Sequence, residues 1–198
     1  MTRVSLEVLV AGAKAGNLVS FPTDTVPALA VRPERADLVF AAKQRDQSKP
    51  LILMAATPAE LWPFTLGSED ERQLWQQVAQ AYWPGALTLV LPASESVPAA
   101  MNPSNPKTIG LRVPNHPMAC SILSQTGPLA TTSANLSGQP PLLTMAEIAT
   151  QFPNVLIPLR ELLAAETGIG TPSTVVKWMG CGWEVLRQGA VKLEYGME

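Results

Sequence analysis

The chain has 198 residues, 46% of them apolar, and 14 lysine and arginine residues against 16 acidic ones give a formal charge of −2. This charge argues against a generic polyanion binder, whose affinity comes from broad neutralisation of phosphates. Cys120 and Cys181 form no C-x-x-C pattern, and no stretch has the ~18 apolar residues of a membrane span. We therefore expect a globular cytoplasmic protein with free, buried thiols and a single domain over residues 1–198.

Apolar residues alternate between helical and extended spacing along the first quarter of the chain. Residues 5–15 have helical spacing, and residues 18–21 form a short apolar strand that ends at a proline. A loop is expected over 23–33 and a helix over 34–45. Residues 51–54 are apolar on both faces, which is typical of a central buried strand.

Three capping boxes mark further helix starts. Thr57, Ser68 and Thr144 are each followed three residues later by a glutamate, which is the signature of a helix N-terminus. Several connections are too short for a helical crossover, so the strands include antiparallel pairs, and an α/β (α+β) fold with a mixed sheet of about eight strands is expected. The remaining strands are expected at 86–91, 108–113, 129–132, 155–158, 173–178 and 184–187.

Three cations lie close together where the helix over 34–45 ends. They are Lys43, Arg45 and Lys49, in a chain that is otherwise sparing with charge. A cluster of this kind indicates a phosphate site. The helix dipole alone also favours cations in a last helical turn, so both interpretations remain open at this point.

Most standard chemical signatures are absent. The chain has neither a G-x-x-x-x-G-K-[ST] phosphate loop nor a G-x-G-x-x-G motif after a strand. With His116 as the only histidine, a multi-histidine metal centre is excluded, and a surface turn is the favoured position for this residue. Asp24 could ligate magnesium or hold its loop by bonding backbone amides, and the second role is favoured.

Three hydroxyl-rich segments lie at the ends of expected strands. Residues 22–25, 131–135 and 171–174 combine threonine, serine, asparagine and aspartate. Each segment by itself is also typical of an ordinary turn. Their order along the chain, together with the cation cluster, carries more information than any one of them.

Eight sequence blocks follow one another in a fixed order. They are Pro22-Thr-Asp-Thr-Val26, Lys43-Gln-Arg45, Lys49-Pro-Leu51, Trp83-Pro-Gly-Ala-Leu-Thr-Leu89, Thr108-Ile-Gly-Leu-Arg-Val-Pro114, Ser133-Ala-Asn-Leu-Ser-Gly138, Ser173-Thr-Val-Val176 and Leu186-Arg187-Gln-Gly189. In this order they resemble the YrdC-type threonylcarbamoyl-AMP synthases, in their short, single-domain bacterial form. The resemblance extends over nearly the whole chain.

The resemblance implies a fold and an activity. The fold is a twisted mixed sheet with flanking helices and a large open cavity. The implied enzyme is a nucleotidyltransferase that makes L-threonylcarbamoyladenylate and pyrophosphate from L-threonine, bicarbonate and ATP, for N6-threonylcarbamoyladenosine modification of tRNA. ATP would be a substrate accompanied by Mg2+, with no organic cofactor and no protein-held metal, and separate proteins would transfer the group to tRNA.

The resemblance also assigns residues to the site. Arg112, four residues after Thr108 and so on the same strand face, would bind the carboxylate of threonine, the alternative being a surface ion pair. Lys43, Arg45 and Arg112 would be catalytic. The ATP-binding residues would be Lys43, Arg45, Lys49, Thr108, Ser133, Asn135, Pro141 and Arg187. The threonine-binding residues would be Thr25, Met54, Arg112, Thr131 and Ser173.

Three departures from the family pattern bear on these assignments. Pro27 and Ala28 replace the usual Tyr-Gly, so an aromatic ring and an amide donor are lost. Met54 stands where many relatives have histidine, and its sulfur is only a weak acceptor. Pro141 replaces a serine, which leaves only the backbone for contact with ATP.

Three other functions are compatible with parts of the pattern. A module that binds double-stranded RNA or tRNA would use a basic concave face, and the acidic balance argues against it. Carbamoyl transfer in hydrogenase maturation is performed by longer proteins with C-x-x-C repeats, which this chain lacks. An inactive regulatory relative is suggested only by Pro27, Ala28 and Met54.

Overall fold

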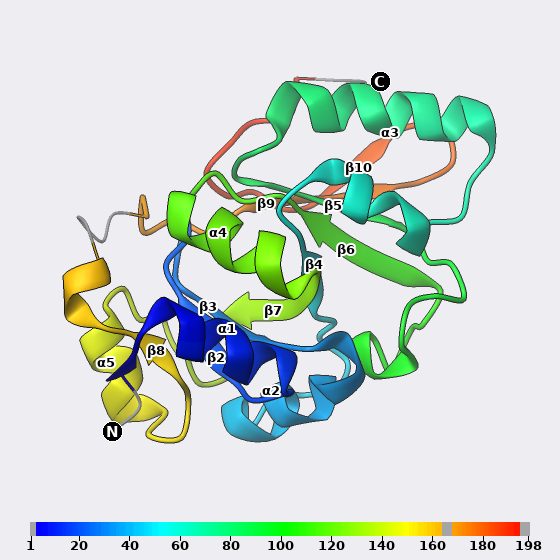
Figure 1. Cartoon of the computed structure of the whole chain (residues 1–198). Helices are drawn as coiled ribbons and strands as arrows, with labels where there is room; N and C mark the ends of the chain where they lie inside the picture. The colour runs from blue at the N-terminus through cyan, green and yellow to red at the C-terminus, as the bar shows by residue number, and fades with distance from the viewer. Residues whose placement is uncertain (1–2, 164–167, 195–198) are drawn as a thin grey trace.

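The computed structural model describes residues 3–163 and 168–194, in which helices flank a twisted sheet (Figure 1). Within these residues, eight strands form one sheet in the order β10-β9-β5-β6-β4-β7-β3-β2, and β1 pairs separately with β8. The strands are β1 (Arg3–Val4), β2 (Val19–Phe21), β3 (Ala28–Val31), β4 (Ile52–Met54), β5 (Leu87–Pro92), β6 (Thr108–Arg112), β7 (Leu129–Ser133), β8 (Ile157–Pro158), β9 (Thr174–Trp178) and β10 (Trp183–Arg187).

The sheet is mixed, as expected from the short connections. Strand β4 runs parallel to β6, and β5 runs parallel to β9, whereas the other neighbours in the large sheet are antiparallel. The α/β expectation with about eight strands is therefore confirmed.

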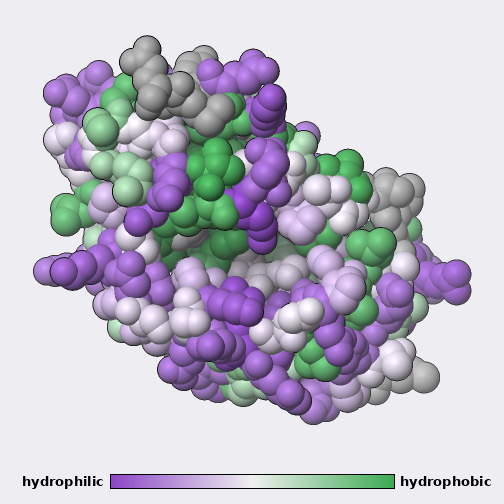
Figure 2. Space-filling view, turned by 180° about the vertical axis from the view of Figure 1, so that it is seen from behind, coloured by the Kyte–Doolittle hydropathy of each residue, from purple (hydrophilic) through white to green (hydrophobic). Residues whose placement is uncertain are grey.

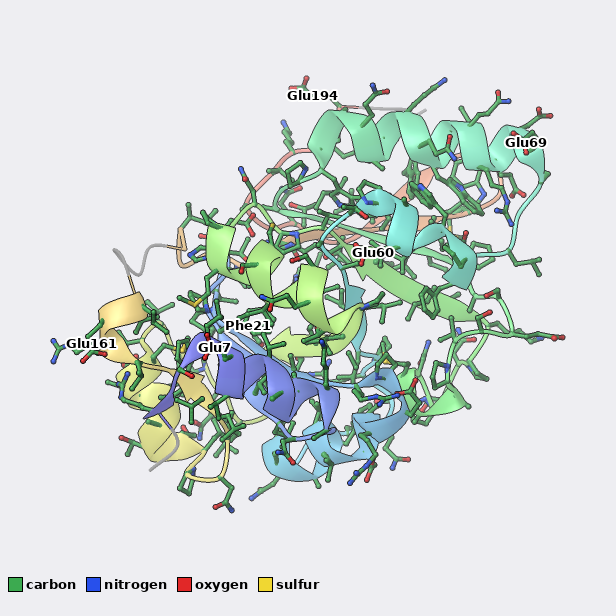
Figure 3. The ribbon with its side chains drawn as sticks, viewed as in Figure 1. Glu7, Phe21, Glu60, Glu69, Glu161 and Glu194 are labelled. Carbon is green, nitrogen blue, oxygen red and sulfur yellow. The ribbon has the colours of Figure 1, made fainter. Side chains whose placement is uncertain are left out.

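Helices cover both faces of the sheet. Phe21, Ala30 and Met54 pack with α1 and α4, which contact each other. Adjacent strand residues such as Leu29 and Leu53 point to the opposite face, where α2 and α3 pack. Phe21 accordingly lies inside the molecule in Figure 3, while Glu69 and Glu194 lie at its periphery. The α-helices are α1 (Leu6–Lys14), α2 (Ala36–Lys43), α3 (Glu69–Tyr82), α4 (Pro117–Thr126) and α5 (Met145–Gln151), and the 3-10 helices are Pro33–Arg35, Pro58–Glu60, Trp62–Phe64, Ala99–Met101 and Arg160–Leu162.

The capping boxes form as the sequence predicts. Ser68 and Thr144 each accept a hydrogen bond from the backbone of the glutamate three residues later, and that glutamate bonds back to the cap. At Thr57 the backbone amide donates to Glu60 at 2.8 Å, but the chain forms two short 3-10 helices there in place of an α-helix.

Some expectations were wrong or incomplete. The loop expected over 23–33 contains strand β3, which pairs with β2 and β7. The helix expected over 34–45 begins with a 3-10 turn and its α-helical part ends at Lys43. Both cysteines are free, but Cys181 is exposed and Cys120 is only half-buried, so the expectation of buried thiols fails.

Candidate active site

A cavity of about 420 Å3 lies over the sheet face that also carries Met54. Its floor is formed by β4, β5, β6, β7 and β9, and its walls by the loop after β2, the segment after α2, and β10. Figure 2 shows a hollow in the middle of the molecule, with hydrophilic residues around its mouth. Most of the site residues named from the sequence line the cavity: Thr25, Arg45, Met54, Thr108, Arg112, Thr131, Ser133, Ser173 and Arg187.

Strand periodicity explains why these residues meet. Thr108, Gly110 and Arg112 alternate along β6 with buried residues that face the other way. Met54 lies opposite Arg112 on the parallel neighbour β4. Because residues opposite one another on paired strands share a face, the strand pairing brings these side chains to one floor.

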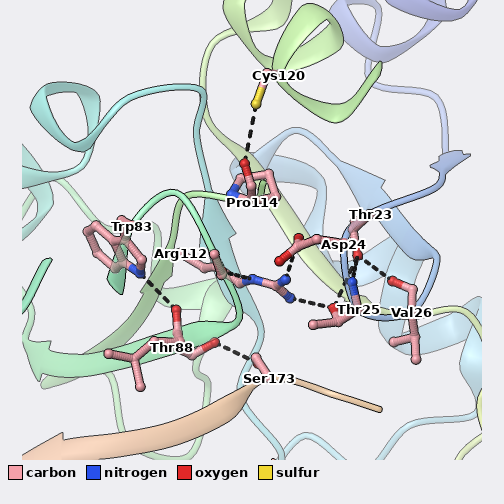
Figure 4. A network of polar contacts seen from close by, with 12 residues as sticks. Thr23, Asp24, Thr25, Val26, Trp83, Thr88, Arg112, Pro114, Cys120 and Ser173 are labelled. Atoms are coloured by element: carbon pink, nitrogen blue, oxygen red, sulfur yellow. Dashed lines mark hydrogen bonds and ion pairs between the residues drawn. The ribbon is translucent and has the colours of Figure 1, made fainter. Parts of the chain in front are cut away.

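Arg112 is held by three contacts with two different segments (Figure 4). Its Nε donates to the carbonyl of Gly85 at 3.0 Å, one terminal nitrogen donates to Thr25 Oγ1 at 2.8 Å, and the other donates to Asp24 Oδ1 at 2.7 Å. A guanidinium has five N–H groups, so two remain for a ligand. Burial lowers the pKa of Arg112, and the charge and hydrogen bond of Asp24 oppose this effect.

The partner of Arg112 corrects two expectations. Asp24 was expected to bond backbone amides, but its carboxylate forms a buried ion pair with Arg112. The alternative considered for Arg112 was an ion pair at the surface. The ion pair exists, but it does not lie at the surface, since only 5% of the Arg112 side chain is exposed. His116 is half-buried at the N-cap position of α4, where its side chain makes no capping hydrogen bond; burial lowers its pKa, and the charge of Asp24 opposes this effect.

A second polar chain crosses the floor from β5 to β10. The hydroxyls of Thr88 and Ser173 lie 2.9 Å apart, and Arg187 donates to the carbonyl of Ser173 at 2.8 Å. Arg187 is thereby directed toward the cavity that it lines. Thr88 was part of a quoted block but received no role from the sequence; in β5 it shares the cavity face with Val90, two residues further along the strand.

Cations dominate the charge of the cavity wall. Arg45 donates to the carbonyls of Lys49 and Pro50 at 3.0 and 3.1 Å, which fixes its side chain beside the opening. Burial first, and then the positive charge of Arg187, lower the pKa of Arg45. No aspartate or glutamate is among the residues that line the cavity in the described part of the chain. An anionic ligand would therefore relieve the repulsion among these cations.

Lys43 lies behind the cavity wall. Residue Gln44 adopts the left-handed conformation (φ 49°) and ends α2, so Lys43 and Arg45 point to different places. The ammonium of Lys43 donates to the carbonyl of Ser133, to Thr132 Oγ1 at 3.3 Å and to Asn135 Oδ1 at 3.4 Å. Burial, and then the charge of Arg45, lower its pKa to about 7.

Three other assigned residues also lie off the cavity wall. Asn135 accepts from the Ser133 hydroxyl at 2.6 Å and donates to the carbonyl of Gln139 at 2.7 Å, so it shapes the loop after β7. Lys49 is exposed, and Pro141 is half-buried. Their contact with ATP stays a prediction.

The described residues include neither a cluster of metal ligands nor a helix that could span a membrane. No group of three His, Cys, Asp or Glu side chains among residues 3–163 and 168–194 could hold a metal ion. In the same part of the chain, no helix is both long and apolar enough to cross a membrane.

A cavity lined by arginines and hydroxyls on a mixed sheet is typical of a protein that binds a small anionic molecule. The family model Sua5_yciO_yrdC, described as "Telomere recombination", matches residues 12–189. The chain belongs to this Sua5/YciO/YrdC family, which confirms the resemblance seen in the sequence.

Several relatives are similar over most of the chain. A threonylcarbamoyl-AMP synthase of Vibrio campbellii is 32% identical over 93% of this chain and 99% of its own length. The synthase of Bacillus subtilis is also 32% identical, over 91% of this chain but 52% of its own length. This chain thus spans about half the length of some of the curated relatives that it matches.

Solved structures have the same fold. P. abyssi Sua5 complexed with L-threonine gives a TM-score of 0.81 at 30% identity, over 93% of this chain and 54% of that one. E. coli YciO gives a TM-score of 0.80 over 96% of this chain and 91% of its own, and its 23% identity supports the fold alone.

Proposed function

We propose that this protein is a threonylcarbamoyl-AMP synthase, a nucleotidyltransferase that converts L-threonine, bicarbonate and ATP to L-threonylcarbamoyladenylate and pyrophosphate. One observation carries the proposal: Arg112 is fixed at the floor of a cationic cavity with two N–H groups unused. The names of the relatives, and the L-threonine complex of P. abyssi Sua5, support the same activity.

The amino-acid end of the cavity would surround Arg112. Its two remaining N–H groups can bind a carboxylate in the bidentate way that guanidinium favours. Hydroxyls of Thr25, Thr131 and Ser173 lie on the same floor or wall, with Met54 as an apolar neighbour. A pocket that bonds the hydroxyl of threonine rejects valine, which would leave buried polar groups unpaired.

The nucleotide end would lie between Arg45, Arg187 and the loop after β7. Arg45 and Arg187 would contact the phosphates directly, while Lys43 would act through the carbonyl of Ser133 and through Asn135. Asn102 fixes Thr108 by donating to its carbonyl and its hydroxyl, both at 3.2 Å, which leaves that hydroxyl free to donate to a nucleotide.

The reaction needs position and charge more than a nucleophilic side chain. Bicarbonate takes up a proton and loses water to give carbon dioxide. The amine of threonine adds to the carbon dioxide and loses a proton, which leaves a carbamate. A carbamate oxygen then attacks the α-phosphorus of ATP, and the bond to the β-phosphate breaks with release of pyrophosphate. Oriented reactants can gain roughly 7–11 kcal/mol, and the fixed arginines stabilise charge that develops on the phosphates.

The proposal also covers the metal ion, the cofactor, the partner proteins and the cellular compartment of the reaction. Mg2+ would arrive bound to the phosphates of ATP, because the described residues hold no cluster of metal ligands. No organic cofactor is needed for this chemistry. The product would pass to separate proteins that modify tRNA, and the site of action would be the cytoplasm, where ATP and tRNA are available.

The direct test is pyrophosphate release from ATP, measured with and without L-threonine and bicarbonate. We expect release to require both, and Arg112→Ala to lose it; Arg112→Lys, with folding checked by circular dichroism, controls for loss of structure. Release that ignores threonine contradicts the proposal. Salt-sensitive RNA binding that persists without ATP or threonine, in a protein that releases no pyrophosphate, would favour the RNA-binding alternative.

A further inference from the structure

Lys177 is a cation of the cavity to which neither the sequence nor the relatives' names give a role. It lies on β9, where buried and half-buried residues alternate strictly. Val176 and Trp178 pack in the core, so Val175 and Lys177 face the other way, and both line the cavity. The strand therefore presents Lys177 to the same space as Arg45 and Arg187.

Strand register places Lys177 relative to the other site residues. Lys177 lies opposite Val90 on β5, and Val90 lies opposite Gly110 on β6. Arg112 is two residues beyond Gly110 on the same face. Lys177 is thus about 7 Å along the strands and about two strand spacings of 4.8 Å across from Arg112. This separation is consistent with contact between Lys177 and the β- and γ-phosphates of an ATP molecule whose α-phosphorus is attacked near Arg112.

The floor beside Lys177 carries no side chain at Gly110. A Cβ added there would already be in van der Waals contact with Ile52 Cγ1 at 3.4 Å and Thr88 Cγ2 at 3.5 Å. Arg187 lies opposite Val175, which is two residues from Lys177 on the same face of β9. Arg187 bonds to Ser173, on the side of Val175 away from Lys177, so Lys177 extends the cationic lining of the same cavity about 7 Å further along β9 from Val175.

Lys177 has no partner of its own within the described residues. It makes no hydrogen bond to a side chain and no ion pair there. The acidic residue nearest in register is Glu184, which lies opposite Lys177 on β10 and is exposed without forming an ion pair with it. A pairing between these two residues is the structural alternative.

We propose that Lys177 is a further phosphate-binding residue, which contacts the phosphates that leave as pyrophosphate. The inference rests on the proposed use of ATP. It differs from a general electrostatic effect because it concerns the outer phosphates alone. Arg45 and Arg187 would hold the phosphates from the other walls of the cavity, and Lys177 would hold them from the floor at β9.

Calorimetric titrations with magnesium-ATP, AMP and magnesium pyrophosphate test this role. Lys177→Gln should weaken ATP and pyrophosphate binding by about 10- to 100-fold, the effect of one charge-assisted hydrogen bond, and change AMP binding less than about twofold. Lys177→Arg should keep most of the affinity. Lys192→Gln, which removes an exposed lysine outside the cavity, and Glu184→Gln should bind all three as the wild type does.

The outcomes separate this inference from the proposed function. Unchanged ATP and pyrophosphate binding in Lys177→Gln, or an equal loss for AMP, would overturn the role of Lys177 while leaving the synthase proposal intact. Weaker binding in Glu184→Gln that equals the loss in Lys177→Gln would favour the structural pair and overturn the role as well. A wild type that binds none of the three ligands would overturn both proposals.

Discussion

The ion pair between Asp24 and Arg112 allows a quantitative test of how the site is held. Replacing Arg112 with methionine fills its space but removes donors at 3.0, 2.8 and 2.7 Å from Gly85, Thr25 and Asp24. The carboxylate of Asp24, whose side chain is 16% exposed, is then left without a counter-charge. Breaking one partner of a buried pair costs about 3–5 kcal/mol, and we expect Arg112→Met to lower the free energy of unfolding by this amount.

A double-mutant cycle separates the pair from its surroundings. Asp24→Asn retains an oxygen that can accept from Arg112 and should cost about 1–3 kcal/mol. The double variant has no unpaired charge, so its loss should be smaller than the sum of the single losses by about 1–3 kcal/mol. Urea denaturation followed by circular dichroism measures all four proteins. Losses that add to within about 0.5 kcal/mol, or an Arg112→Met loss below about 1 kcal/mol, would refute the reasoning.

Two further predictions concern stability. The pKa of Lys43 is lowered to about 7 in the folded chain from its ordinary value of 10.5. At a pH between these two values, the unfolded chain therefore binds more protons than the folded chain does. The free energy of unfolding should therefore rise with pH, by up to about 1.4 kcal/mol per unit, and urea titrations of Lys43→Met should lack this component; parallel pH profiles of the two proteins would contradict it. Ser68→Ala removes the acceptor for the backbone of Glu71 and should cost about 1 kcal/mol in thermal or urea unfolding, and no loss would show that the cap is unimportant.

Local signals in the sequence predicted the central strands and the α-helices other than α4, for which the sequence analysis gave no expectation. The caps at Ser68 and Thr144 lie within one turn of the residues that they bind, so sequence spacing was sufficient. Strand β3 was missed because Ala28–Val31 is short and follows Pro27 and a turn-forming segment. Its extended conformation depends on pairing with β2 and with β7, which lies about a hundred residues further along the chain.

The residues of the site also divide into those that the sequence predicted and those that only the structure could place. Ordered blocks named Thr25, Arg112, Ser173 and Arg187, and the structure brings all four to one cavity. Lys43 and Arg45 looked equivalent in the sequence, but the left-handed Gln44 between them sends one behind the wall and the other to the opening. A single backbone conformation therefore divides the cation cluster into a residue that supports a loop and a residue that lines the cavity.

By itself, the sequence determined the α/β class, the family and several of the residues that line the cavity, because these depend on short-range periodicity and on the order of the blocks. Only the tertiary structure decided which side chains of the site contact one another. Asp24 and Arg112 are 88 positions apart, and Lys177 meets the cavity only through the register of β9 on β5. Contacts of this kind arise when distant strands pair, and no local pattern of residues encodes which side chains then lie opposite one another.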